Sequence, residues 1–178
     1  MLLLGIDEAG RGCLAGPLCV AGVILHKSID GLADSKKLSI KKRNTLFEKI
    51  ISNSTHKIIF TDAKTIDEIG LSKAIKNSLI AITTSLKYDK AIFDGNTTLG
   101  VSNLEWMIKA DTKVAEVSAA SILAKVSRDR YMLEVDKEFP IYQFAKHKGY
   151  GTKLHRELIG EHGYIQEHRK SFKIKSLI

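Results

Sequence analysis

Four acidic residues stand at the ends of short apolar segments, where their carboxylates could bind metal ions. In chain order, the acids are Asp7, Glu8, Asp94 and Asp111. If the apolar segments are neighbouring strands of one sheet, their ends converge and the carboxylates meet. Such oxygen ligands suit hard cations like Mg²⁺ or Mn²⁺. Two such cations can activate a water and stabilise the leaving oxygen in phosphodiester hydrolysis.

Each acid taken alone also has an ordinary structural interpretation. Asp94 precedes a glycine, a common turn pair, and Asp111 before a helix could be an N-cap. In a regular strand, Asp7 and Glu8 point to opposite faces. Both reach one site only if the pleat breaks there, and we expect Gly10 to permit such a break.

The triplet Gly10-Arg11-Gly12 could bring a backbone close to a ligand. Two glycines allow the close approach, and the guanidinium of Arg11 could reach a phosphate. With Gly16, the glycine spacing misses the G-x-G-x-x-G dinucleotide fingerprint, and the following segment is typical of a strand. A flexible turn is the alternative interpretation.

Basic side chains beside an aromatic ring suit phosphate contact combined with stacking. Lys36 and Lys37 precede a predicted helix, and Lys148 lies two residues before Tyr150. Solvated lysines and a half-buried tyrosine would explain the same pattern. The six histidines form no HExxH spacing, and nothing in the sequence singles one out.

Composition narrows the class of protein. The 178 residues, 44% of them hydrophobic, suit one core with a short appendage. The net charge is +8, which favours a polyanionic partner such as nucleic acid or an anionic membrane. The last 37 residues carry eight Lys or Arg against three acids, and a solvated basic helix and tail would explain this excess as well as nucleic-acid binding would.

Cysteine usage and hydropathy indicate a cytoplasmic protein. Cys13 and Cys19 have no metal-ligand spacing, so we expect two small buried side chains. The longest apolar run, residues 13–25, is too short to span a bilayer and follows acidic residues rather than a basic leader. We therefore expect no membrane segment and no secretory signal.

The order of predicted elements indicates an α/β domain with a mixed sheet. Ser39 is the expected N-cap of the first helix, and Pro140 ends the longest one. We expect strands at residues 2–7, 18–25, 57–61, 91–93 and 106–109, and helices at residues 39–51, 71–83, 114–138 and 152–161.

Six short motifs occur in a fixed order along the chain. They are GIDEAGRG at residues 5–12 with LAGP at 14–17, DSKKLS at 34–39, DGN at 94–96, KAD at 109–111 with AASILAKV at 119–126 and RD at 128–129, HKGYGTK at 147–153, and HRKSF at 168–172. In order and spacing, these motifs resemble bacterial ribonuclease HII over residues 4–172.

The resemblance implies a ribonuclease H-like mixed β-sheet flanked by helices. Residues 1–140 would form this catalytic domain. Residues 141–178 would form a small, basic, helical C-terminal extension packed beside the active site. The resemblance also implies a monomer whose substrates are RNA/DNA hybrids and DNA duplexes containing ribonucleotides.

The resemblance further implies a role for each candidate residue. The four acids would be the catalytic ligands of two divalent cations, Mn²⁺ or Mg²⁺. The glycine-arginine triplet would recognise a 2′-hydroxyl, and Tyr150 would stack on the next sugar. The implied substrate-binding set is Gly10, Arg11, Gly12, Lys36, Lys37, Lys148 and Tyr150.

The implied activity is endonucleolytic hydrolysis of the RNA strand of a hybrid and incision 5′ of single ribonucleotides in duplex DNA, as in ribonucleotide excision. Products would carry 5′-phosphate and 3′-hydroxyl ends. The alternatives are a non-catalytic nucleic-acid-binding module and another metal-dependent nuclease of the same fold, of the resolvase or integrase type. Cys13, Glu116 and Val117 depart from the family pattern without removing a catalytic group.

Overall fold

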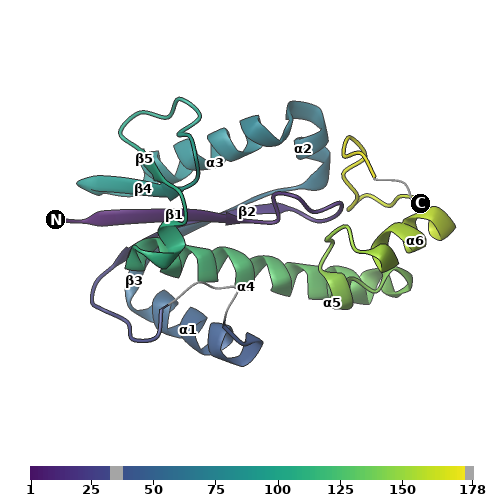
Figure 1. The fold of residues 1–178 in the computed structure, drawn as a ribbon, viewed down its shortest axis with the longest axis horizontal. Helices are drawn as coiled ribbons and strands as arrows, with labels where there is room; N and C mark the ends of the chain where they lie inside the picture. The colour runs from purple at the N-terminus through teal and green to yellow at the C-terminus, as the bar shows by residue number, and fades with distance from the viewer. Residues whose placement is uncertain (33–37, 175–178) are drawn as a thin grey trace.

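A five-stranded mixed sheet forms the centre of the protein (Figure 1). The structure is a computed structural model that describes residues 1–32 and 38–174. The strand order is β3-β2-β1-β4-β5, with β1 antiparallel to β2 and parallel to β4. Their bounds are β1 (Leu3–Ala9), β2 (Leu18–Leu25), β3 (Ser54–Thr61), β4 (Lys90–Asp94) and β5 (Glu105–Met107).

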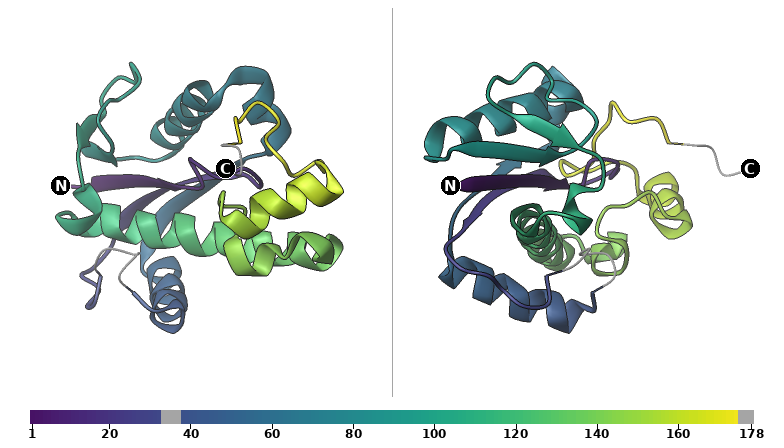
Figure 2. Two further views of the ribbon diagram at one scale, coloured as in Figure 1. Left: turned by 45° about the vertical axis from the view of Figure 1, so that its right-hand side comes forward. Right: turned by 60° about the vertical axis from the view of Figure 1, so that its left-hand side comes forward.

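Helices cover both faces of the sheet (Figure 2). Alternating residues of β1 are shared between two cores: Leu4 and Ile6 pack toward one face, whereas Ala9 packs toward the other. One face is covered by α2 (Ala63–Ile69) and α3 (Leu71–Ser85), and the other by α1 (Ile40–Ser52) and α4 (Ala115–Glu138). This arrangement confirms the predicted α/β class.

The C-terminal part packs on the second half of α4, beyond the end of the sheet (Figure 1). It contains its own small core, in which Met132 and Val135 of α4 meet Tyr142, Phe144 and Leu158. The elements are a 3₁₀ turn η2 (Pro140–Tyr142), α5 (Phe144–His147) and α6 (Lys153–His162). This agrees with a helical extension, while the boundary at residue 140 stays a prediction.

Most predicted elements lie where the sequence indicated. The second strand is predicted to the residue, and Ser39 caps α1 by accepting a hydrogen bond from the Lys42 amide. The predicted end of the strand at residues 106–109 is wrong, because β5 stops at Met107. Trp106 in this strand is exposed. Both cysteines are buried and free, as expected. Within the described ranges, no helix combines the length and apolarity needed to cross a membrane.

Gly5 lets the first turn of α4 lie directly on β1. A Cβ atom at this position would stand 2.2 Å from the carbonyl carbon of Glu116 and 2.3 Å from the amide nitrogen of Val117. Both neighbours are backbone atoms of a helix, so neither can move aside cheaply. This close approach sets the position of α4 relative to the acidic end of β1.

Gly5→Ala is therefore expected to destabilise the protein by about 1–3 kcal/mol or more, because overpacking must shift β1 or α4. Gly160→Ala in α6 is the matched control, since its Cβ would meet no atom within 4 Å. That variant should gain roughly 0.5–1 kcal/mol from helix propensity. Urea unfolding of both variants measures the difference, and equal stabilities would contradict this account of Gly5.

Candidate metal centre and nucleic-acid interface

Three carboxylates converge at one edge of the sheet. Asp7, Asp94 and Asp111 each offer an oxygen atom, and these atoms all lie within 4.8 Å of one another. Parallel pairing sets the first two side by side, because Ile6 is in register with Phe93. Asp111 arrives from a 3₁₀ turn, η1 (Ala110–Thr112), rather than from the end of a strand as predicted.

Burial and neighbouring negative charge disfavour ionisation of the Asp7 carboxyl group. Its pKa is raised well above the ordinary value, first by burial and then by the charge of Glu8, with Asp94 adding to the effect. Hydrogen bonds from the Ser121 side chain and the Glu8 amide lower the pKa in part. A divalent cation bound by these oxygens would remove the repulsion, so the donor set suits Mg²⁺ or Mn²⁺.

Glu8 lies in the same cavity but on the other side of the strand. The predicted break in the pleat is wrong: β1 stays paired with β2 through Ala9, with Asp7 opposite Ala21 and Glu8 opposite Val20. Glu8 therefore points away from α4, and its carboxylate accepts a hydrogen bond of 3.3 Å from Arg11. Both acids nevertheless line one cavity of about 550 Å³.

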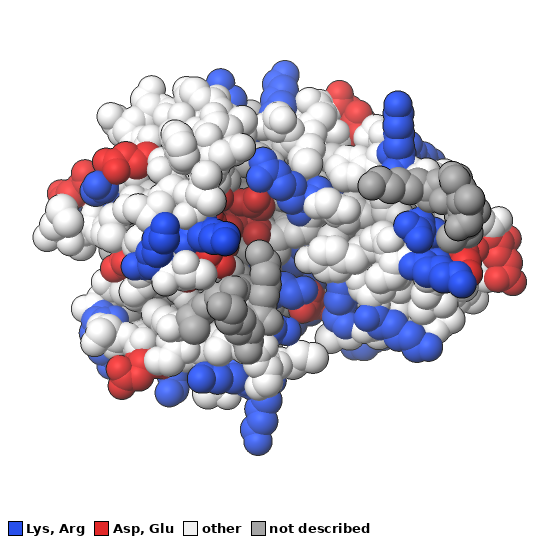
Figure 3. Space-filling model, in the orientation of Figure 1, with Lys and Arg blue, Asp and Glu red and all other residues white. Residues whose placement is uncertain are grey.

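This cavity combines acids with basic and aromatic groups. In the space-filling view, acidic side chains gather near the middle of the face, and Lys and Arg side chains lie close to them (Figure 3). The lining residues are Asp7, Glu8, Arg11, Asp94, Gly95, Asn96, Ile108, Ser121, Lys125 and Tyr150. The site can therefore hold cations at its floor and a polyanion at its rim.

The two glycines of the triplet differ in what surrounds them. Gly10 has φ 86°, and a Cβ there would stand 2.1 Å from Nε of Arg128, so the core requires a glycine. Gly12 has no atom within 4 Å of the same position, so this side of the backbone is open. At Gly12, unlike at Gly10, the space on the Cβ side of the backbone is therefore open to a ligand.

Of the three predicted lysines, the structure describes only Lys148, and it does not line the acidic cavity. Lys36 and Lys37 lie outside the described residues. Lys148 lines a neighbouring groove with Arg43, Arg130 and Lys146, and its ammonium group donates to the Ala145 carbonyl. Tyr150, by contrast, lines the acidic cavity with 39% of its surface exposed.

Two residues of the site were not singled out by the sequence. Ser121 bonds Asp7, and Lys125 lines both the acidic cavity and the neighbouring groove. The Lys125 Nζ atom lies 5.2 Å from the centroid of the Tyr150 ring and 2.8 Å from Asp129. Both residues belong to the motif at residues 119–126, but only their place on α4 links them to the acids.

Three histidines, His147, His155 and His168, are buried in the C-terminal part of the chain. His147 and His155 stack with ring centroids 4.2 Å apart, and His155 contacts His168. Burial first, and the neighbouring histidines next, lower the pKa of His155 to about 4. Burial, with smaller contributions from His147 and Lys170, lowers the pKa of His168 to about 4.

The contribution of His155 and His168 to folding stability is therefore expected to fall as the pH drops from about 6.5 toward 4. The unfolded chain protonates these rings near pH 6.5, while the folded protein keeps them neutral, so the unfolded state binds more protons in this window. The expected loss is on the order of 3 kcal/mol between pH 6.5 and 4.5. Urea titrations at several pH values measure the free energy of unfolding. If its dependence on pH is the same in His168→Gln as in the wild type, this account is contradicted.

The fold and the site together define a class. A mixed sheet with this strand order, carrying acids at the ends of parallel strands beside a basic surface, is the framework of a ribonuclease H-like nuclease. A family model described as Ribonuclease HII matches residues 4–175. The chain belongs to the ribonuclease HII family, and it is a ribonuclease H.

Relatives and solved structures agree with this assignment. Ribonuclease HII of Aliarcobacter butzleri is 56% identical over 177 residues, covering 98% of this chain and 92% of the relative. Ribonuclease HII of Campylobacter hominis is 57% identical, and the match covers 99% of this chain and 97% of the relative. Ribonuclease HII in the PCNA complex from Archaeoglobus fulgidus superposes with a TM-score of 0.86 at 28% identity, covering 100% and 98%. Ribonuclease H2 of Pyrococcus horikoshii superposes with a TM-score of 0.81 at 26% identity, and the match covers 98% of this chain and 95% of the other.

Proposed function

We propose that the protein hydrolyses the RNA strand of RNA/DNA hybrids and incises duplex DNA on the 5′ side of a single ribonucleotide. The observation that carries the proposal is the meeting of three carboxylate oxygens within 4.8 Å on the floor of a cavity lined also by Tyr150. In a non-catalytic binding module, the repulsion between these clustered acids would not be offset by any function.

Asp7, Glu8, Asp94 and Asp111 would hold two divalent cations, Mn²⁺ or Mg²⁺. When bound, the cations supply an activated water and charge stabilisation at the scissile phosphate. Ser121 keeps Asp7 oriented, since its side chain bonds the carboxylate. Arg11 orients Glu8 in the same way. Hydrolysis in which the 3′ oxygen is the leaving group produces 5′-phosphate and 3′-hydroxyl ends.

Recognition of ribose would fall to the triplet and Tyr150. A 2′-hydroxyl both donates and accepts hydrogen bonds, so a close backbone can distinguish ribose from deoxyribose. The open side of Gly12 permits such an approach. Tyr150 would stack on the sugar that follows, and Lys36, Lys37 and Lys148 would contact phosphates, which carry no sequence information.

The expected setting is a monomer acting in the cytoplasm. Free, buried cysteines suit a reducing compartment. Light scattering of the purified protein, with and without substrate, would measure its mass, and a stable dimer would contradict this part of the proposal.

The test of the proposed function uses three labelled duplexes: a uniform RNA/DNA hybrid, a DNA duplex with one ribonucleotide, and an all-DNA duplex. With Mg²⁺ or Mn²⁺, the first two should be cut and the third left intact. Cleavage of the all-DNA duplex would favour a resolvase or integrase type of nuclease. Tight binding without any cleavage would favour a binding module.

Gly12→Val is expected to lower cleavage at a single ribonucleotide by about tenfold or more, because the side chain fills the space where the ribose must approach. Its folding should be unaffected, since a Cβ there meets no atom within 4 Å. Gly10→Val, by contrast, should unfold the protein against Arg128. Cleavage rates and thermal melts separate the two effects, and full activity of Gly12→Val would contradict ribose reading at this position.

A further inference from the structure

Two buried histidines form a chain of hydrogen bonds that ends on the backbone of Tyr150. Nδ1 of His168 accepts from the Ile165 amide at 3.0 Å, so the proton of its ring lies on Nε2. Nε2 of His168 lies 3.1 Å from Nε2 of His155, which must then accept. His155 therefore carries its proton on Nδ1 and donates it to the Tyr150 carbonyl, 2.9 Å away.

Only one arrangement of protons satisfies this chain. The Ile165 amide at one end can only donate, and the Tyr150 carbonyl at the other can only accept. A second proton on His155 would place two N–H groups against each other between the rings, and a second proton on His168 would place its Nδ1–H against the Ile165 amide. With His155 and His168 both neutral and fully buried, the chain has a fixed direction and a fixed geometry.

The same C-terminal segment also holds the loop that carries the glycine-arginine triplet. His168 forms a β-bridge with Ala15, and the amide of Arg169 donates to the Leu14 carbonyl at 2.8 Å. The Arg169 guanidinium donates to the carbonyls of Gly16 and Arg11, at 3.0 and 3.1 Å. Adjacent residues, His168 and Arg169, thus reach both elements that would read the substrate.

The loop around Tyr150 depends on outside contacts for its shape. Lys148 and Gly149 both have positive φ, and the Gly149 carbonyl accepts from the amide of Leu14 at 2.8 Å. The Tyr150 carbonyl accepts from the Thr152 amide as well as from His155. Losing the histidine bond would remove one of the hydrogen bonds that hold the residue whose ring lines the acidic cavity.

We propose that His155 and His168 are positioning residues, which hold Tyr150 at a fixed distance from the Gly10-Arg11-Gly12 triplet so that a ribose and the next sugar are read together. The inference rests on the proposed role of Tyr150 in reading an RNA-to-DNA junction. It assigns a function in substrate selection to two residues that touch neither the acids nor the cavity.

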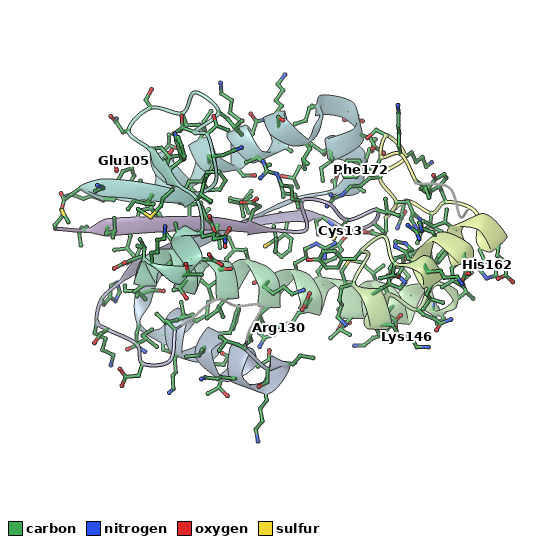
Figure 4. All side chains as sticks on the ribbon, viewed as in Figure 1. Cys13, Glu105, Arg130, Lys146, His162 and Phe172 are labelled. Carbon is green, nitrogen blue, oxygen red and sulfur yellow. The ribbon has the colours of Figure 1, made fainter. Side chains whose placement is uncertain are left out.

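Two substitutions of His168 separate positioning from simple packing. The amide nitrogen of Gln can take the place of Nε2, so His168→Gln retains a donor to His155. The amide oxygen of Asn can take the place of Nδ1, so His168→Asn retains the acceptor for Ile165 but loses that donor. His162→Asn is the control for losing a histidine from this part of the chain, because His162 lies at the end of α6 away from Cys13 and β1 (Figure 4).

The measured quantity is the cleavage rate on a single-ribonucleotide duplex divided by the rate on a uniform hybrid. We expect His168→Asn to lower this ratio about fivefold, as for the loss of one buried hydrogen bond. His168→Gln and His162→Asn should stay within about twofold of the wild type. Equal loss on both substrates in the Asn and Gln variants, with the ratio unchanged, would overturn the proposal.

Hydrogen exchange and Tyr150→Ala distinguish failure of this inference from failure of the proposed function. Faster exchange of the amides at residues 148–152 in His168→Asn, but not in His168→Gln, supports positioning whatever the activity. If Tyr150→Ala leaves the ratio unchanged, Tyr150 does not read the junction, and the exchange data alone decide whether the histidines hold the loop. If Tyr150→Ala lowers the ratio while His168→Asn changes neither ratio nor exchange, positioning is overturned.

Discussion

Asp7→Asn should abolish cleavage of every ribonucleotide-containing duplex while making the metal-free protein more stable at neutral pH. The rate is expected to fall by roughly 10³-fold or more, because a neutral amide binds a divalent cation poorly and several kcal/mol of charge stabilisation at the phosphate are lost. Asp94→Asn should behave alike. The measurement is a single-turnover cleavage rate at saturating Mn²⁺.

The gain in stability follows from the raised pKa of Asp7. Above the ordinary aspartate pKa, the unfolded chain ionises freely, whereas the folded protein must retain a proton or bury a charge beside Glu8 and Asp94. The contribution of Asp7 to the stability of the metal-free wild type therefore falls as the pH rises from the ordinary pKa toward the raised one, and it stays lower above that, opposite in sign to the contribution of His155 and His168. Asparagine removes this penalty, so its advantage should be absent near pH 4 and should grow as the pH rises above the ordinary aspartate pKa.

Metal binding gives a second readout for the same variant. Mn²⁺ should raise the melting temperature of the wild type, since it binds the folded state alone, and should leave Asp7→Asn nearly unchanged. Asp30→Asn is the control, because this acid lies outside the acidic cavity. A variant Asp7→Asn that cuts at near-normal rates, or that melts below the wild type without metal, would remove Asp7 from the metal centre.

The α/β class and the proximity of Asp7 and Asp94 could be predicted from the sequence because both depend on local patterns. Short apolar segments followed by Asp7 and Asp94 indicate strand ends, and parallel pairing of β1 with β4 then brings these two side chains together. The position of Asp111 was harder to predict from the sequence, since η1 has no apolar periodicity of its own. For the same reason α2 and α5, of seven and four residues, were not predicted.

Contacts between distant segments could not be predicted from the sequence. His155 and His168 are 13 residues apart with no regular pattern between them, and only the return of the chain along Ala15 brings their rings together. The difference between Gly10 and Gly12 is hidden for a similar reason. It depends on where the side chain of Arg128, more than a hundred residues away, passes beneath the loop.

Substitution of Arg128 is expected to have a large effect on stability. The side chain is fully buried on α4, and its guanidinium donates to the carbonyls of Pro17, Lys148 and Ala15 at 2.8–2.9 Å. These bonds join the loop after β1 to the loop that carries Tyr150. The central helix, the triplet and the C-terminal extension are thereby fixed to one another through a single residue.

Arg128→Met is expected to reduce the free energy of unfolding by about 3–5 kcal/mol. Replacing a buried ion pair with apolar side chains can be neutral, because both charges disappear together. Here the acceptors are backbone carbonyls, which no substitution of Arg128 removes, so three of them would lose a partner inside the protein. Arg128→Lys should recover only part of the loss, since one ammonium group cannot reproduce three donors in a planar fork.

Arg130→Met is the matched control, two residues further along the same helix. Its side chain is half exposed, donates to Glu48 and lies 4.3 Å from the centroid of the Phe47 ring, so the change should cost about 1 kcal/mol or less. Urea unfolding with EDTA compares the three variants without any contribution from metal binding. A loss in Arg128→Met no greater than in Arg130→Met would mean that the loops hold their geometry without Arg128, and that the close approach at Gly10 is tolerated rather than required.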